Sequence, residues 1–235
     1  MKSIKTSFMK NNFIEGTFQN RTNRFIAEVI VGNEVGIAHV ANTGRCKELL
    51  VPGVKVLLNK NDNPNRKTKY SLNYVENKGY WVNMVSVSAN LAVYNSLIAG
   101  EIETIKNPYD IQREFCMPGT RIDIYCKNEK MDVYIEVKSV TLLKDEYLQF
   151  PDAPTLRGVK HLDHLIELKR QGKRAIILFV AQHPLGQIFK ANLENDPVFA
   201  NKLKEAQEEG VEILAYMASS ELGVLKLTNS LPIEI

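Results

Sequence analysis

The sequence predicts a small β-barrel followed by an α/β domain with a central mixed sheet. Between Phe13 and Val85 the chain reads as short β segments separated by turn residues, without helical periodicity. From Ala89 onward, helical and strand patterns alternate. The charge changes near the same point, because residues 1–85 hold 13 lysine and arginine residues against six acidic ones, whereas residues 86–235 hold 17 against 21. We therefore predict two domains, 1–85 and 86–235.

Turn signals such as Pro52-Gly53 and Asn77-Lys78-Gly79 divide the first domain into short strands. The expected strands span residues 25–31, 35–41, 54–59, 70–76 and 80–85. Five short strands are typical of an oligonucleotide-binding (OB) barrel, although an SH3-like barrel would give nearly the same pattern.

The second domain is expected to alternate helices with strands. Apolar residues at three- and four-residue steps predict a first helix over residues 89–106, which stops before Asn107-Pro108. Two alternating strands and then a helix–strand–helix–strand series follow in the order 121–126, 133–140, 155–171, 175–181, 197–209 and 211–216. This order indicates an α/β domain.

Composition excludes several classes of protein. The 235 residues are 44% hydrophobic and 24% charged, as in ordinary globular proteins. No apolar run reaches the roughly 18 residues that a membrane span needs, and Met1–Lys5 leads into no apolar signal segment. The three cysteines share no CxxC spacing. We expect a reduced cytoplasmic protein without a zinc knuckle or membrane contact.

The chemistry is expected on the paired strands of the second domain. Glu136 and Lys138 are two residues apart, so both project to one face of a strand while Ile135 and Val137 pack behind. A plausible hairpin register brings Asp123 opposite Glu136. Two close carboxylates repel unless a cation separates them, and hard oxygen ligands favour Mg²⁺ or Mn²⁺. Lys138 would then assist a metal-activated water in phosphodiester hydrolysis, although Glu-x-Lys is more often an exposed ion pair.

The first domain carries two clusters in which cations adjoin an aromatic residue, 21–25 and 66–70. Such clusters suit nucleic acid, because cations contact phosphates and rings stack on bases. The alternative is that Phe25 and Tyr70 are core residues of strands with solvated ends. The candidate phosphate contacts of this domain are Arg21, Arg24, Arg45, Arg66, Lys67 and Lys69.

Several stretches resemble the sugar fermentation stimulation protein family. The stretch 135–142 (IEVKSVTL) is followed by 150–155 (FPDAPT) and by Arg157-Gly158. Similar stretches elsewhere are 38–45 (AHVANTGR), 48–53 (ELLVPG), 66–70 (RKTKY), 160–162 (KHL), 196–200 (DPVFA) and 210–216 (GVEILAY). The resemblance runs from about Phe18 to Tyr216 with the order and compatible spacing retained.

This resemblance implies an OB-fold domain joined to a domain of the restriction-endonuclease-like, PD-(D/E)xK, superfamily, with DNA binding as the usual activity. The family's acidic and lysine positions fall on Asp123, Glu136 and Lys138. The family name refers to a bacterial effect on sugar utilisation and defines no reaction.

Further candidates surround these three residues. Glu101 on the first helix is where the wider nuclease superfamily often supplies another metal-binding carboxylate, and a plain surface position is the alternative. Arg157 and Lys160 would hold a phosphate near the start of the next helix, where Thr155 is the expected N-cap. Additional candidates are Asp152, His161 and Gln182.

Three functions fit the sequence. The first is a Mg²⁺- or Mn²⁺-dependent nuclease whose barrel binds DNA. The alternative is a non-catalytic DNA-binding regulator of sugar (maltose) metabolism, in which the nuclease-like domain is a scaffold. A third is an assembly protein whose barrel binds another protein.

Overall fold

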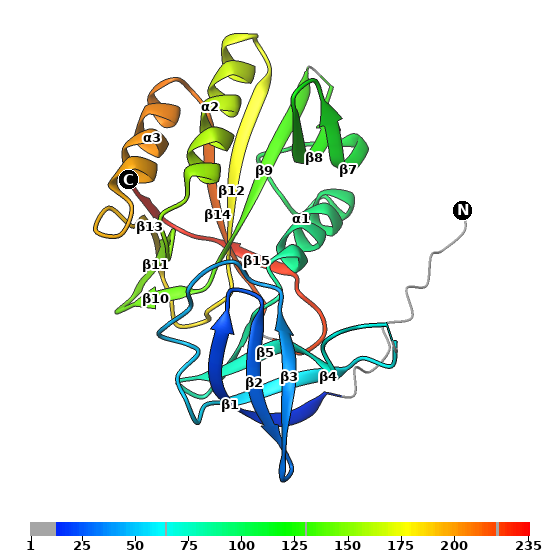
Figure 1. Cartoon of the computed structure of the whole chain (residues 1–235). Helices are drawn as coiled ribbons and strands as arrows, with labels where there is room; N and C mark the ends of the chain where they lie inside the picture. Colours follow the sequence, from blue (N-terminus) through cyan, green and yellow to red (C-terminus); the bar gives the residue numbers. More distant parts are fainter. Residues whose placement is uncertain (1–12, 64, 130, 220) are drawn as a thin grey trace.

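The computed structural model describes residues 13–63, 65–129, 131–219 and 221–235. It consists of an N-terminal β-barrel and a C-terminal α/β domain, which lie end to end (Figure 1). The chain passes from the barrel to the first helix of the α/β domain over residues 84–86. The sequence-predicted fold class is confirmed.

Five strands close the barrel. They are β1 (Ile14–Asn23), β2 (Ile26–Val31), β3 (Glu34–Val40), β4 (Lys55–Lys60) and β5 (Tyr70–Asn77). The hydrogen-bonded order is β3-β2-β1-β4-β5, and parallel pairing of β3 with β5 closes the ring. Apolar side chains, among them Phe18, Val29 and Leu72, fill the interior.

Two strands of the barrel differ from the prediction. The predicted strand over 80–85 is β6 (Tyr80–Asn83), which extends the sheet from β5 and is not one of the five closing strands. The fifth barrel strand is β1, which the sequence reading missed. Within β1 only Phe18 is buried, and polar residues dominate its second half, so the alternation that marks a half-buried strand is weak.

The α/β domain contains three helices and two sheets. Its elements are α1 (Val87–Ala99), β7 (Tyr109–Met117), β8 (Thr120–Lys127), β9 (Asp132–Val140), β10 (Leu142–Lys144), β11 (Tyr147–Phe150), α2 (Leu156–Arg170), β12 (Arg174–Ala181), β13 (Ile188–Ala191), α3 (Pro197–Glu208), β14 (Glu212–Ala218), β15 (Leu227–Ser230) and β16 (Ile233–Glu234). The main sheet has the order β15-β14-β12-β9-β8-β7 and is mixed, and β10-β11-β13-β16 form a smaller one. Within the described residues, no helix is long and apolar enough to cross a membrane.

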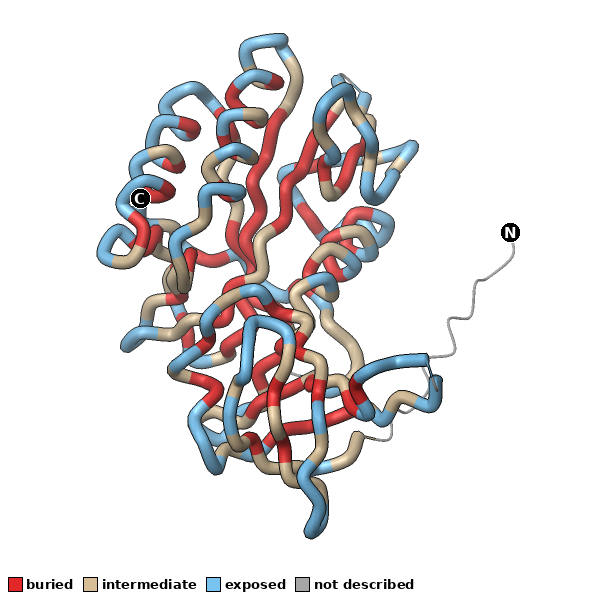
Figure 2. Tube along the Cα trace, in the orientation of Figure 1, coloured by how far each residue is buried: buried red, intermediate tan, exposed pale blue. Residues whose placement is uncertain are grey.

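Helices cover both faces of the main sheet, with α1 on one face and α2 and α3 on the other (Figure 1). The central strand β12 is buried along nearly its whole length (Figure 2). Its residues alternate between the two cores: Ile177 and Phe179 pack on the side of α2 and α3, whereas Ile176 and Leu178 pack on the side of α1. This burial on both faces explains the continuous apolar run of the strand.

The first helix is shorter than predicted. It ends at Ala99 because Gly100 adopts a left-handed conformation (φ 72°), and its backbone N–H bonds back to the last turn. Ile102 and Ile105 continue the apolar spacing and are buried, but they lie in the turns after the helix. The second helix agrees more closely, and Thr155 caps it by accepting a hydrogen bond from the Gly158 backbone N–H at 3.0 Å.

Hydrogen bonds at several points dock the barrel onto the α/β domain. The Cys46 backbone N–H donates to Asp152 at 3.0 Å, and the Ser86 backbone N–H to the Ala41 carbonyl at 3.0 Å. At the other side, His183 Nε2 lies 3.0 Å from Asn77 Oδ1, and the Gly223 backbone N–H donates to the Tyr74 hydroxyl at 2.8 Å. The orientation of the two parts is therefore fixed at several separate points.

Candidate functional site

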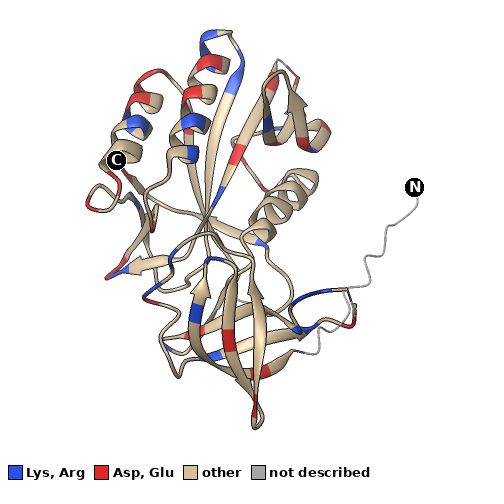
Figure 3. Ribbon diagram, in the orientation of Figure 1, with Lys and Arg blue, Asp and Glu red and all other residues tan. Residues whose placement is uncertain are grey.

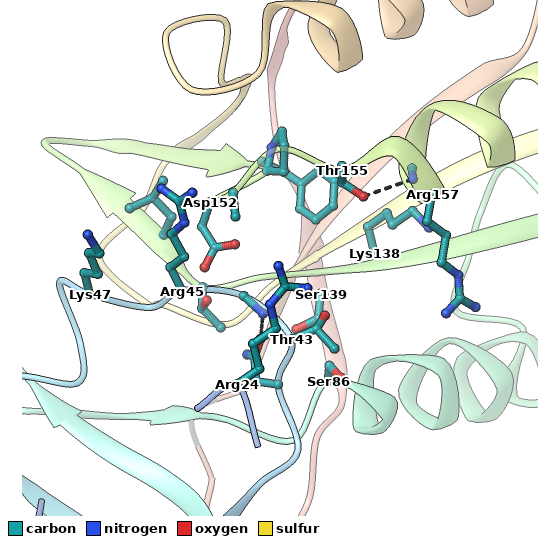
Figure 4. A pocket seen from close by; sticks show the side chains of 18 of the residues that line it. Arg24, Thr43, Arg45, Lys47, Ser86, Lys138, Ser139, Asp152, Thr155 and Arg157 are labelled. Atoms are coloured by element: carbon teal, nitrogen blue, oxygen red, sulfur yellow. Dashed lines mark hydrogen bonds between the residues drawn. The ribbon is translucent and has the colours of Figure 1, made fainter. Parts of the chain in front are cut away.

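A cleft of about 920 Å³ lies between the barrel and the α/β domain. Its walls combine the barrel segments 20–24 and 42–47 with the end of β9 and the start of α2. Figure 4 shows Arg24 and Arg45 on the barrel side and Lys138 and Arg157 on the α/β side. Glu136, Lys138 and Asp123 all line this cleft.

Glu136 is at the centre of a cluster of polar side chains. It lies on β9 and is only 2% exposed, and Lys138 Nζ and His161 Nδ1 both contact its Oε1 atom. Ile135 and Val137 pack on the opposite face, against α1. The alternation of a strand therefore produces the arrangement, with charged residues toward α2 and apolar residues toward α1.

His161 joins this cluster from α2. Its Nδ1 atom also lies 3.1 Å from Lys138 Nζ, and Arg157 Nε donates to its Nε2 atom at 3.2 Å. Arg157 and His161 are four residues apart, so they share one face of the helix. Burial alone would raise the pKa of Glu136, but the His161 hydrogen bond and the Lys138 charge hold that pKa below its ordinary value. Glu136 is therefore a carboxylate at neutral pH.

Asp123 reaches the same region from β8. The β8–β9 ladder pairs Ile124 with Ile135, and one further step brings Asp123 to Glu136. Asp123 Oδ2 accepts a hydrogen bond from the Val137 backbone N–H at 2.8 Å. Burial and the nearby Glu136 charge raise the pKa of Asp123 to about 6, against the opposing effect of the Val137 hydrogen bond. The two neighbouring carboxylates thus differ: the pKa of Asp123 is raised, whereas that of Glu136 is lowered.

The chemistry of these donors fits a hard divalent cation. Mg²⁺ commonly binds one or two carboxylates and completes its coordination with waters and substrate phosphate. Asp123 and Glu136 supply two such carboxylates. Across the described residues, no group of three or more His, Cys, Asp or Glu side chains is placed to hold a metal ion. Asp123 and Glu136 would therefore hold a cation only together with ligands from water or substrate.

The structure does not bring Glu101 to this cluster. The residue follows the C-terminal end of α1, where it is exposed and accepts a hydrogen bond from Ser96 Oγ at 2.7 Å. The cleft is lined instead by Asn90, near the start of α1, which hydrogen bonds with Asp123. Since a helix rises about 1.5 Å per residue, the two ends of α1 are well separated.

The predicted nucleic-acid contacts divide into two groups. Those that line the cleft are Arg21, Arg24, Arg45 and Arg157. Those that do not line it are Arg66, Lys67, Lys69 and Lys160. The first three of this second group belong to the loop between β4 and β5, at the right in Figure 3, where Arg66 bonds Asn61 Oδ1 at 2.6 Å and Lys69 pairs with Glu34 at 3.6 Å.

Arg21 organises the barrel side of the cleft. Its guanidinium donates to the backbone carbonyls of Asn42 at 2.6 Å, Gly44 at 2.6 Å and Arg45 at 2.8 Å, and also to that of Arg24. Because this guanidinium already donates to four carbonyls, it has few N–H donors left to bind a phosphate. Arg21 therefore fixes the two segments that present Arg24 and Arg45.

The two aromatic residues of the cation clusters differ in position. Tyr70 is buried in the barrel core, so the core alternative is correct there. Phe25 is 49% exposed, and its ring lies nearly parallel to that of His39 with centroids 6.5 Å apart. Of the two rings, only Phe25 offers a face to a ligand.

Asp152 and Gln182 have partners within the protein. Asp152 lines the cleft and accepts the interdomain hydrogen bond from Cys46. Gln182 is buried outside the cleft lining and donates to Ser139 Oγ. Ser139 itself lines the cleft, so Gln182 contacts a residue of the lining without lining the cleft itself.

The cleft also contains residues that the sequence reading did not select, namely Lys47, Asn90 and Ser139. Asn90 had an available signal, because it is an amide in the first turn of a mostly apolar helix. Ser139 follows the Glu-x-Lys motif directly. Lys47 had no distinguishing signal among the basic residues of the barrel.

The fold and site define a class of two-domain protein, in which an OB-type barrel and an α/β domain enclose paired carboxylates and a lysine. Residues 20–84 match the family described as "SfsA N-terminal OB domain", and residues 87–222 match "Sugar fermentation stimulation protein RE domain". The chain belongs to the sugar fermentation stimulation protein family.

Individual relatives support this membership over nearly the full length. A sugar fermentation stimulation protein homolog of Methanobrevibacter smithii is 48% identical over 226 residues, which cover 92% of this chain and 95% of the relative. One from Acetivibrio thermocellus is 36% identical over 97% of this chain and 99% of the relative. Among solved structures, Pyrococcus furiosus SfsA in complex with Ca²⁺ is similar with a TM-score of 0.87 and 32% identity, covering 95% of this chain and 96% of that one.

Proposed function

We propose that this protein is a metal-dependent phosphodiester hydrolase that acts on nucleic acid, in the first instance DNA. The single observation that carries the proposal is the grouping of Asp123, Glu136 and Lys138 in one cleft whose walls are rich in arginine. Two carboxylates suit a divalent cation, and a neighbouring ammonium suits the negative charge of a phosphate. The Pyrococcus furiosus relative is described as a complex with Ca²⁺, which supports the expectation that this protein also binds a hard cation.

In this mechanism Asp123 and Glu136 hold Mg²⁺ or Mn²⁺. When bound, the metal supplies Lewis-acid activation of a water and of the phosphate. Lys138, which already contacts Glu136, orients the water and stabilises the charge that develops on the phosphate oxygens. His161 keeps Glu136 and Lys138 together, and Arg157 holds a phosphate at the mouth of the cleft.

The test is cleavage of end-labelled DNA by the purified protein with Mg²⁺, with Mn²⁺ and with EDTA. We expect hydrolysis with either metal, a loss of at least about 100-fold in Asp123→Asn and Lys138→Ala, and no hydrolysis in EDTA. Glu101→Gln is the matched control, because it also removes a carboxylate of the α/β domain but one distant from the cluster. Its activity should equal that of the wild type.

Hydrolysis that persists in both site variants would come from a contaminant or another site and would refute the proposal. DNA binding without hydrolysis under any metal condition would instead assign the non-catalytic regulatory role. Absence of both binding and hydrolysis would exclude the two nucleic-acid functions together.

A further inference from the structure

We infer that the cleft takes single-stranded nucleic acid in preference to a duplex. The inference rests on the proposed function, because it names the substrate class of the same site.

The reacting groups are at the bottom of a recess. Glu136 is 2% exposed, and the Lys138 side chain is 12% exposed. A phosphate must therefore enter the cleft before it can approach either residue. Duplex DNA is usually read by an element that enters a groove, such as a helix in a major groove about 12 Å wide. Here the chemistry lies between two walls, so the ligand has to enter the protein.

The size of the recess suits a few nucleotides. Its volume of about 920 Å³ is within the range of roughly 300–1,000 Å³ that is usual for pockets that bind small molecules. A nucleotide is a molecule of that class, so the recess has room for a short stretch of single strand. A duplex turn is about 34 Å long and carries two strands, and it exceeds this space.

Cations lie on both walls of the recess. Arg24, Arg45 and Lys47 belong to the barrel side, whereas Lys138 and Arg157 belong to the α/β side. Figure 3 shows basic segments on both sides of the junction between the two parts. A single strand that passes between the walls has its phosphates within reach of both groups. This is the combination of charged groove and short backbone track found in single-strand binding proteins.

The domain contacts resist widening of the cleft. The Cys46–Asp152 hydrogen bond joins the two walls themselves, and the His183–Asn77 and Gly223–Tyr74 hydrogen bonds join the domains elsewhere. These contacts favour a ligand that enters the cleft at its present width, as a single strand does, over one that needs a wider opening.

Binding is the readout that tests this inference separately from catalysis. Fluorescence anisotropy of the full-length protein in Ca²⁺ would compare a labelled 15-nucleotide oligothymidine with a labelled 15-base-pair duplex. We expect the single strand to bind at least about tenfold more tightly. Arg24→Ala and Arg45→Ala should each weaken single-strand binding about tenfold and reduce the salt slope by about 0.7.

The matched control is Lys60→Ala, which removes an exposed cation of the barrel outside the cleft lining and should leave both affinities unchanged. Equal or tighter binding of the duplex would overturn the inference, and so would an equal loss in Lys60→Ala and Arg24→Ala. The Mn²⁺ cleavage assay on the same two probes separates the two proposals. Tight binding and hydrolysis of the duplex reject this inference alone, whereas single-strand preference without hydrolysis of either probe rejects the proposed function alone.

Discussion

Gly44 of the barrel lies directly against Asp152 of the α/β domain, which makes Gly44→Ala an informative perturbation. A Cβ atom at this position would lie 2.3 Å from Asp152 Oδ2 and 2.7 Å from Oδ1. The backbone of Gly44 is not left-handed, so the cost of alanine is purely steric. The Asp152 carboxylate must move, and its hydrogen bond with the Cys46 N–H is then lost.

The magnitude follows from these two contributions. Overpacking of a close contact costs about 1–3 kcal/mol, and a lost hydrogen bond to a charged group costs about 1.5–3 kcal/mol. A carboxylate that moves away relieves the overpacking but loses the hydrogen bond, so the two costs do not add in full. We therefore expect a loss of about 2 kcal/mol in the free energy of unfolding. For a chain of this size that corresponds to a decrease in Tm of about 4–8 °C.

Thermal unfolding followed by circular dichroism would measure the change, in a double-mutant cycle with Asp152→Ala. Once Asp152 has been shortened, the added methyl group of Gly44→Ala has no carboxylate to displace. The second substitution should therefore cost less than about 0.5 kcal/mol, and the two effects should not add. Full additivity of the two losses would refute the reasoning, because the alanine would then be acting on something other than Asp152.

Three other predictions concern different parts of the molecule. Burial lowers the pKa of His183 to about 4 from an ordinary value near 6.5, so the unfolded chain binds the proton more readily and the free energy of unfolding should fall between pH 6.5 and pH 4, by at most roughly 3 kcal/mol. Urea unfolding at pH 7 and pH 5 should show a smaller loss of stability in His183→Gln than in the wild type. An identical loss in both proteins would contradict the assignment. His161→Ala should lower the cleavage rate about 10- to 100-fold, because Glu136 loses the partner that orients it. Steady-state kinetics should show the effect in kcat. A change confined to KM would mean that His161 only binds substrate. Phe25→Ala should weaken single-strand binding by about 1–3 kcal/mol through loss of a stacking face. Tyr80 is another half-exposed ring of the barrel region, and Tyr80→Ala should leave the affinity unchanged. Equal affinities of wild type and Phe25→Ala in the anisotropy assay would exclude stacking at the Phe25 ring.

The sequence predicted those parts of the fold that repeat a strong local pattern. The strands with clear alternation or continuous apolar character, such as β9 and β12, were found close to their observed bounds. The polar strand β1 and the strands of two to four residues in the smaller sheet were not found. Such segments form strands because the tertiary structure aligns them with their neighbours, and their own sequence shows little pattern that would predict a strand.

The same distinction applies to the site. The grouping of Asp123, Glu136 and Lys138 could be predicted because a two-residue spacing on a strand and a neighbouring hairpin strand fix it locally. The sequence could not predict which of the basic residues line the cleft. Arg24 and Arg66 both lie near an aromatic residue in the sequence, yet only the former lines the cleft. Which face of a barrel meets a second domain is decided by contacts more than 100 residues apart, such as that between Cys46 and Asp152.

The docking hydrogen bonds between the barrel and the α/β domain determine how the protein can be divided into fragments. A cut after residue 85 severs one peptide bond, but it also removes the partners of Cys46, Asn77 and Tyr74 and exposes a completely buried thiol. We therefore expect neither the barrel nor the α/β domain to behave as an independent unit when it is separated from the other. A fragment that fails to bind or to cleave would report the loss of its other half, and transplanting either part into another protein would require its docking surface to be redesigned.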